Sequence, residues 1–206
     1  MIELFLRAGY DGVIITDHFS DYNPIFTRSA PWRDKVDRFW EGYEDFRDHA
    51  IREGLSVLPG LELTFRGDPN DYLVYGLSRE WILEHSSFHH WTLESFVANI
   101  DRSSVLIVQA HPFRFGMIPR TSPEVDGVEV YNGNARHDSG NPFALEWART
   151  RELLQTSGSD FHKPEDCGRG GMVFPRKIEG IEDFIVQVRE GSASLVWEGE
   201  SSLACC

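Results

Sequence analysis

Five short apolar runs in the sequence each end at side chains that can bind a cation or an anion. The runs have the length and composition of buried strands. Because the carboxyl ends of parallel strands meet on one face of a barrel or an open sheet, such side chains predict a shared active site. The side chains at these ends are His18, Glu62, His111, Asn132, Asp160 and His162. Mixtures of imidazole and carboxylate suit zinc, manganese or iron ions, so the pattern predicts a metal-dependent enzyme or the remains of one.

Two of these positions carry more specific signals than the others. Glu62 stands between Leu61 and Leu63, and a carboxylate inside an apolar strand is costly unless it is paired or bound to a metal. Asp160 and His162 are spaced by one residue, so their side chains point to the same side of an extended chain. A carboxylate can also bridge two ions, which together clamp a phosphoryl group and activate a water. A single histidine at a strand end is more often structural, so the prediction depends on the whole set.

Alternating strands and helices are expected to position these residues. Residues 32–54 have helical periodicity and form the longest predicted helix. Residues 72–77 follow a turn-forming segment and predict a hairpin inserted into the alternation. The other buried strands are predicted at residues 12–16, 55–65, 104–110, 127–131 and 153–162. This order indicates an α/β fold with right-handed crossovers, in a single domain over residues 1–206.

Local signals add three expectations about the ends of these elements. The polar segment 21–31 contains prolines and is predicted to be a loop. Asn141 is expected to cap the helix over residues 141–153, with Pro142 at its first position. The chain opens with a predicted helix at residues 3–9 that has no strand before it.

The composition is that of a folded protein with an acidic surface. Its 206 residues are 41% hydrophobic, and the formal net charge is −13. This charge repels nucleic acid backbones and anionic membranes, so neither is an expected partner. A phosphorylated substrate would also be repelled unless bound cations invert the local field. Cys167, Cys205 and Cys206 do not form a disulfide pattern, and no membrane segment or signal peptide is visible, so a cytoplasmic location is expected.

Four short motifs resemble those of the PHP (polymerase and histidinol phosphatase) superfamily. They are IITDH ending at His18, GLE ending at Glu62, AHP around His111 and GSDFH ending at His162. The GRGG stretch at residues 168–171 also resembles the segment that follows the last motif of the family. The resemblance implies a distorted seven-stranded (β/α) barrel with up to three metal ions, and many members are phosphoesterases.

Carried over residue by residue, the resemblance also implies roles for the side chains. Glu62 would bridge two ions, with Asp160 as a further ligand of the first and His111 of the second. His18 and His162 would hold the third ion. Glu62, Asp160 and His111 would thus form the catalytic centre.

The sequence departs from the family pattern at its start. The family opens with a strand bearing His-x-His, and no histidine precedes His18 here. We therefore expect a distorted (β/α)7 TIM-like barrel without its first strand, with weak or partial metal loading and low activity, since each ion keeps only two of these ligands. Asp71 stands where many relatives carry a further histidine ligand. The sheet edge left open could pair with a second copy of the chain to form a homo-oligomer.

Other side chains are candidates for substrate binding or for replacing missing ligands. Arg114 could bind a substrate phosphate through its planar fork or could form a loop salt bridge, and Asn132 could donate to the substrate. Among the remaining histidines His137 is the best substitute ligand, ahead of His85 and of the pair His89 and His90, which is expected at the surface or a helix end.

The function that follows is a metal-dependent hydrolase. A phosphoesterase acting on a small phosphorylated substrate through a metal-activated water is the preferred hypothesis. One alternative is a catalytically impaired or non-catalytic PHP-like domain that binds a metal or a ligand. Another is an amidohydrolase-type enzyme that cleaves a C–N or carboxylic ester bond at the same ions.

Overall fold

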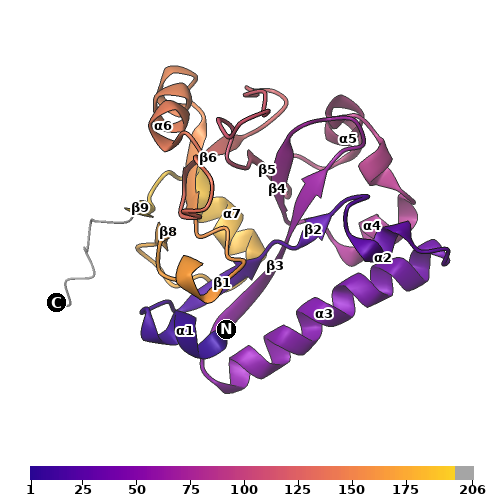
Figure 1. Ribbon diagram of the computed structural model, residues 1–206, viewed down its shortest axis with the longest axis horizontal. Helices are drawn as coiled ribbons and strands as arrows, with labels where there is room; N and C mark the ends of the chain where they lie inside the picture. The colour runs from indigo at the N-terminus through magenta and orange to yellow at the C-terminus, as the bar shows by residue number, and fades with distance from the viewer. Residues whose placement is uncertain (198–206) are drawn as a thin grey trace.

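A computed structural model describes residues 1–197 as a curled sheet with helices packed around it (Figure 1). The strands are β1 (Gly12–Ile15), β2 (His18–Phe19), β3 (Ser56–Thr64), β4 (Asp71–Tyr75), β5 (Leu106–Gln109), β6 (Gly127–Asn132), β7 (Leu154–Gly158), β8 (Gly170–Val173) and β9 (Ser194–Trp197). The helices are α1 (Ile2–Arg7), α2 (Pro24–Thr27), α3 (Trp32–Arg52), α4 (Arg79–Glu84), α5 (Leu93–Asn99), α6 (Asn141–Thr150) and α7 (Ile181–Arg189), with short 3-10 helices η1 (Phe88–His90) and η2 (Pro164–Asp166).

The main sheet has the strand order β1-β3-β4-β5-β6-β7, and β2 also pairs with β3. Strands β1 and β2 run parallel to β3, and β5, β6 and β7 run parallel to one another. The expected hairpin is confirmed, because β4 runs antiparallel to β3. Strand β4 is antiparallel to β5 as well, which interrupts the simple alternation of a (β/α)7 barrel. The fold is therefore mixed α/β with a sheet curled like part of a TIM-like barrel.

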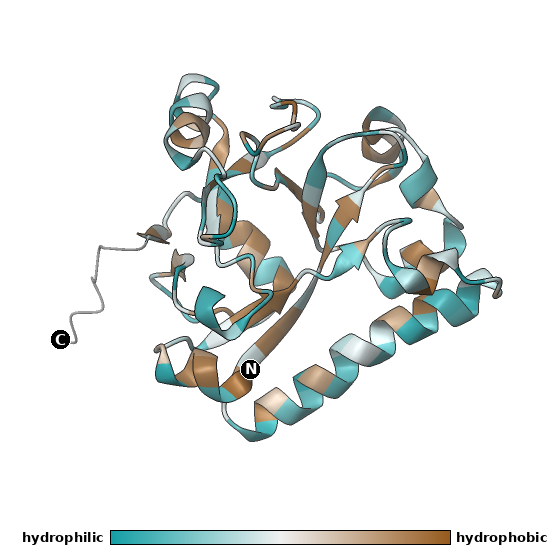
Figure 2. Ribbon diagram, in the orientation of Figure 1, coloured by the Kyte–Doolittle hydropathy of each residue, from teal (hydrophilic) through white to brown (hydrophobic). Residues whose placement is uncertain are grey.

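Both faces of the sheet are buried, and the side chains alternate between them. In β5, Leu106 and Val108 pack with Phe184 of α7, whereas Ile107 belongs to a cluster with residues of α3, α4 and α5. This is the period-two pattern of a strand covered on both sides. In Figure 2 the central strands are largely hydrophobic, while much of α3 that faces the viewer is hydrophilic.

Three local predictions were wrong. The strand expected to reach residue 162 ends at Gly158, and Asp160 is not extended because its φ is 46°. The segment expected to be a loop contains α2, because the Asn23 side chain accepts a hydrogen bond from the Ile25 amide, and Phe26 is buried. Helix α6 is capped by Gly140 rather than by Asn141. The Asn141 side chain instead bonds to the backbone of a residue of β6, the strand that leads into the site described below.

Strand β1 forms one end of the main sheet, so the predicted self-pairing through an open edge stays a prediction. Within residues 1–197, no helix combines the length and the apolar character that crossing a membrane requires. Cys205 and Cys206 lie outside the described residues.

Candidate metal centre and active site

Glu62 lies between two imidazoles at the carboxyl end of β3. His18 pairs with Glu62 in the parallel register of β2 and β3, and its Nδ1 lies 3.6 Å from Glu62 Oε2. On the other side, His111 Nε2 lies 3.3 Å from Glu62 Oε1. The two oxygens of one buried carboxylate therefore face different histidines, as a bridging ligand would require.

Asp71 completes a compact group with Glu62 and His111. Its Oδ2 lies 3.9 Å from His111 Nε2, and its Oδ1 accepts a hydrogen bond from Thr64, its antiparallel partner on β3. Ligand atoms of Glu62, Asp71 and His111 all lie within 4.8 Å of one another. Two carboxylates and one imidazole thus point at a common volume that a single ion could fill.

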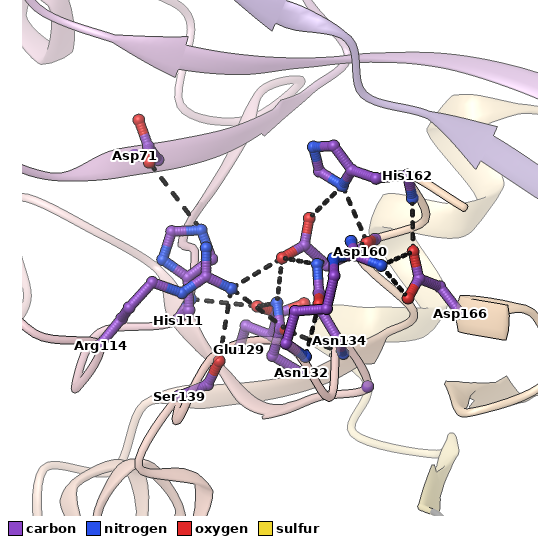
Figure 3. Close-up of polar contacts among 12 residues, drawn as sticks. Asp71, His111, Arg114, Glu129, Asn132, Asn134, Ser139, Asp160, His162 and Asp166 are labelled. Atoms are coloured by element: carbon purple, nitrogen blue, oxygen red, sulfur yellow. Dashed lines mark hydrogen bonds and ion pairs between the residues drawn. The ribbon is translucent and has the colours of Figure 1, made fainter.

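Asp160 lies at the centre of a second set of contacts in the same site (Figure 3). Its Oδ2 accepts a hydrogen bond from Arg114 Nη2 at 2.7 Å and from Asn132 Nδ2 at 3.2 Å. Asn134 Nδ2 donates to the backbone carbonyl of Asp160 at 3.2 Å. His162 Nδ1 lies 3.2 Å from the other carboxylate oxygen, and the His162 ring lies 6.1 Å from the ring of His18.

Glu129 supports the site from inside β6. Its Oε2 accepts hydrogen bonds from the His111 amide at 3.0 Å and from Asn132 Nδ2 at 2.9 Å. The first bond holds a strained part of the backbone, since His111 has φ of 29°. Asp160, which Asn132 also contacts, has φ of 46°. Side chains other than glycine rarely adopt positive φ, and such conformations persist where the surroundings enforce them, often at functional sites.

The loop after Asp160 is fixed by an ion pair between Arg136 and the buried carboxylate of Asp166. Arg136 Nη1 donates to both oxygens of Asp166, at 2.6 and 2.8 Å. The same carboxylate accepts from the backbone amides of His162 and Lys163. Arg136 and Asp166 therefore hold the backbone that presents His162 to the site.

Burial and crowding of charge shift the pKa values of the acidic groups. Burial, followed by the neighbouring charge of Glu62, raises the pKa of Asp71. Burial raises the pKa of Glu129 to about 7. For Asp160 burial acts in the same direction, but the hydrogen bond and charge of Arg114 outweigh it and lower the pKa. Burial opposes protonation of His111, yet Glu62 and Glu129 together raise its pKa.

All five predicted metal ligands line one pocket of about 250 Å³. The pocket is also lined by Asp71, Arg114, Asn134, Arg136, His137 and Lys163. The donor set fits a divalent cation, because a positive charge would offset both the burial and the repulsion by Glu62 that raise the pKa of Asp71. The mixture of one imidazole and two carboxylates suits zinc, manganese or iron.

Sequence reasoning overlooked several residues of the site. Glu129 stands in an apolar strand as Glu62 does, so the same signal could have found it. The sequence marks Asp71 only as a position where many relatives carry a histidine, whereas in the structure it faces His111. No local pattern marked Asn134, Ser139, Arg136 or Asp166. Asn132 contacts Asp160 as well as Glu129 and so belongs to the network beside the pocket.

The histidines considered as substitutes lie in different places. His137, which the sequence predicted to be the best substitute ligand, lines the pocket. His85 stacks on Trp81 and bonds to its carbonyl group. His89 and His90 instead lie beside Asp21, and His89 is buried.

Comparison with known proteins agrees with this fold. The sequence model of the PHP-associated family matches residues 138–193. The structure of PsfC from Pseudomonas syringae PB-5123 has a TM-score of 0.71 and 20% identity, and the match covers 96% of this chain and 81% of that chain. A two-domain protein from Bacteroides vulgatus ATCC 8482, which contains a predicted PHP-like metal-dependent phosphoesterase, has a TM-score of 0.64 and 17% identity. That match covers 94% of this chain and 60% of the two-domain protein, so this chain corresponds to only part of it.

A search of curated proteins finds no match. The family match and the shared fold together confirm the resemblance to the PHP superfamily.

Proposed function

We propose that the chain is a metal-dependent hydrolase, and that it acts as a phosphoesterase on a small phosphorylated substrate in the pocket around Glu62. The observation that carries this proposal is the convergence of Glu62, Asp71 and His111, which come from β3, from β4 and from the end of β5. The presence of a predicted PHP-like phosphoesterase in the two-domain protein from Bacteroides vulgatus supports the same reaction class.

The side chains divide into two groups that could hold cations. Glu62, Asp71 and His111 would hold one ion, and Glu62 could bridge to a second ion through the oxygen that faces His18. Asp160 and His162 lie beside each other as further ligands. A bound divalent cation would act as a Lewis acid and lower the pKa of a water molecule.

Arg114 is the side chain best placed to orient an anionic substrate. Its Nη2 donates to Asp160 and lies near Asn132 and Ser139, which fixes the plane of the guanidinium. Its Nε is buried and has no hydrogen-bond partner among the described residues. The guanidinium also lines the pocket, where its remaining N–H groups could donate to a phosphate oxygen. Asn132 would act indirectly, by holding the carboxylate of Asp160.

A second candidate function is a non-catalytic domain that binds a metal or an anionic ligand. The Arg114–Asp160 ion pair favours it, because a guanidinium already neutralises a carboxylate that a phosphoesterase would use for an ion. Within the pocket, metal would then load at the group of Glu62, Asp71 and His111.

The described part of the chain acts as one unit in this proposal. The segment matched by the family model contains β7 and α7, and β7 pairs directly with β6 of the main sheet. Helix α7 packs on the sheet through Phe184, Ile185 and Val188. These contacts support a single domain rather than two.

Metal content and hydrolysis measured on the same protein samples test the proposal. The purified chain is loaded with Mn²⁺ or Zn²⁺ and assayed with aryl phosphate monoesters and diesters, and with amide and carboxylic ester substrates. Glu62→Gln and His111→Gln are expected to lower both bound metal and phosphate release by at least about tenfold. Glu80→Gln, the same chemical change on the exposed face of α4, is the matched control.

The outcomes distinguish the phosphoesterase, the non-catalytic domain and the amidohydrolase-type enzyme. Phosphate release that disappears with the bound metal supports the phosphoesterase. Metal binding with no turnover of any substrate supports the non-catalytic domain, and cleavage of amides or carboxylic esters alone supports the amidohydrolase-type reaction. Equal metal content in Glu62→Gln, His111→Gln and the unmodified chain would remove the basis for the site.

A further inference from the structure

A second group of potential metal ligands lies outside the pocket. Asp21 follows β2, and His89 and His90 belong to η1, which follows α4. Nε2 of His90 lies 2.9 Å from Asp21 Oδ1, and Nε2 of His89 lies 3.3 Å from the same oxygen. Ligand atoms of all three residues lie within 4.8 Å of one another. Two imidazoles and a carboxylate from distant parts of the sequence therefore converge on one point.

The surroundings of Asp21 resemble those of a metal-binding carboxylate. Its Oδ1 faces the imidazoles, whereas its Oδ2 accepts a hydrogen bond from Arg66 Nε at 2.7 Å. A carboxylate that binds a metal through one oxygen is commonly held by a hydrogen bond at the other. The Arg66 amide also donates to the His89 carbonyl at 2.8 Å, so one residue positions both sides of the group.

Aromatic packing holds His89 rigidly. Its side chain is 3% exposed, and its ring stacks on Trp32 with a centroid distance of 5.9 Å and an interplanar angle of 13°. Phe19 and Phe26 contact the same ring. An apolar setting disfavours a charged imidazole, so a neutral ring with an available lone pair is favoured. Asp21 and His90 are 35% and 31% exposed, which leaves the group open to an ion from solvent.

We propose that Asp21, His89 and His90 form a second divalent cation site, distinct from the pocket around Glu62. Two nitrogen ligands and one oxygen ligand suit zinc or a similar borderline ion, with water completing the coordination. The ion would join the segment after β2 to η1. Because β2 carries His18, the site would also stabilise the part of the chain that presents one pocket ligand.

The alternative explanation is a purely hydrogen-bonded cluster in which both imidazoles donate to Asp21. The substitution His90→Gln separates the two explanations. A glutamine amide can still donate a hydrogen bond to Asp21, but it is a poor ligand for zinc. If the group is a metal site, the parent binds zinc and His90→Gln loses that binding. If it is only a hydrogen-bonded cluster, neither protein binds zinc there.

The experiment is zinc titration of the full chain carrying Glu62→Gln and His111→Gln, which removes two of the three ligands of the first group. This double variant is expected to bind about one Zn²⁺ per chain. Adding His90→Gln is expected to lower that affinity by at least about tenfold. Adding His49→Gln, on the exposed face of α3, is expected to leave it unchanged.

Two further measurements guard against a folding defect. Asp21→Asn in the same background is expected to weaken zinc binding as His90→Gln does, while circular dichroism remains that of the folded chain. Co²⁺ bound in place of Zn²⁺ should give visible absorption bands that disappear in both variants. The proposal is overturned if the double variant binds no zinc, or if a folded His90→Gln variant binds it as tightly as the parent.

Discussion

Arg114 Nη2 lies 2.7 Å from Oδ2 of Asp160, and the two side chains are only 19% and 9% exposed. The ion pair places a guanidinium on a carboxylate that the resemblance to the PHP superfamily assigns to a metal ion. Arg114 and a cation are therefore alternative partners for Asp160. Which of them holds the carboxylate decides whether Asp160 serves metal binding or only the architecture of the site.

Replacing Arg114 by Met is expected to destabilise the metal-free protein. The change leaves a largely buried carboxylate without its charged partner, which costs about 3 kcal/mol of the free energy of unfolding. Arg114→Lys should retain part of this stability, because it keeps the charge but not the planar fork. Urea unfolding in the presence of a chelator measures both values.

Urea unfolding repeated in excess Mn²⁺ tests whether a cation competes with Arg114 for Asp160. If a cation can replace the guanidinium, Mn²⁺ should stabilise Arg114→Met more than the unmodified chain. Arg47→Met, which removes an exposed pair with Asp48, is the control and should change stability little in either condition. Equal stability of Arg114→Met and the unmodified chain without metal would contradict the assigned role of the ion pair.

Glu129 is expected to make the stability of the metal-free protein depend on pH. Its folded pKa, about 7, lies above the value of roughly 4.3 in the unfolded chain. A carboxyl group with a raised folded pKa contributes its full stability below the unfolded pKa and loses it as pH rises through the folded pKa. The free energy of unfolding should therefore fall by roughly 3 kcal/mol between about pH 4 and pH 8 because of this group.

Glu129→Gln should remove this dependence, because the amide does not titrate while its oxygen can still accept from the His111 amide and Asn132. Urea unfolding across this pH range, with a chelator present, should give a flatter profile for the variant, with the largest gain in stability near pH 8. Parallel profiles for the variant and the unmodified chain would rule out Glu129 as the source of the slope.

Asp71 is expected to bind metal in place of the histidine that many relatives carry at this position. Asp71→Asn should weaken Zn²⁺ and Mn²⁺ binding by at least about tenfold, because it removes a charge beside Glu62 and His111. Asp71→His should restore zinc binding more than manganese binding, since imidazole suits zinc better than manganese. Competition with a metal indicator dye measures these affinities, and unchanged binding in Asp71→Asn would exclude Asp71 from the site.

The sequence predicted much of this site because strand ends obey simple geometry. His18, Glu62 and His111 follow or end apolar runs, and the alternation of strands with helices places such ends together. The structure brings these residues and Asp160 and His162 to one pocket. Burial of a carboxylate in an apolar run was also a valid signal, and it applied equally to Glu129.

The remaining features depend on contacts between residues that are distant in the sequence. The turn before β4 predicted its hairpin with β3, but no local pattern fixes the register that places Asp71 opposite Thr64. The antiparallel pairing of β4 with β5 has no local signal either. Arg114 and Asp160 are separated by 46 positions, so their ion pair depends on the complete strand order. Asp21 and His90 are separated by 69 positions for the same reason.

Gly158, the last residue of β7, provides a test of how tightly Glu129 is held. A Cβ atom at this position would lie 2.9 Å from Glu129 Oε1, closer than real Cβ contacts allow. Glu129 cannot move freely, because its other oxygen accepts from the His111 amide and from Asn132. Gly158→Ala is therefore expected to cost about 1–3 kcal/mol of the free energy of unfolding and to weaken metal binding through His111.

Gly42→Ala is the matched control, because no atom lies within 4 Å of a Cβ added there in α3. It should raise the free energy of unfolding by up to about 1 kcal/mol, since alanine favours a helix over glycine. Urea unfolding and zinc titration of both variants provide the measurement. If Gly158→Ala binds zinc as tightly as Gly42→Ala, the carboxylate of Glu129 can shift without moving His111, and it does not position that ligand.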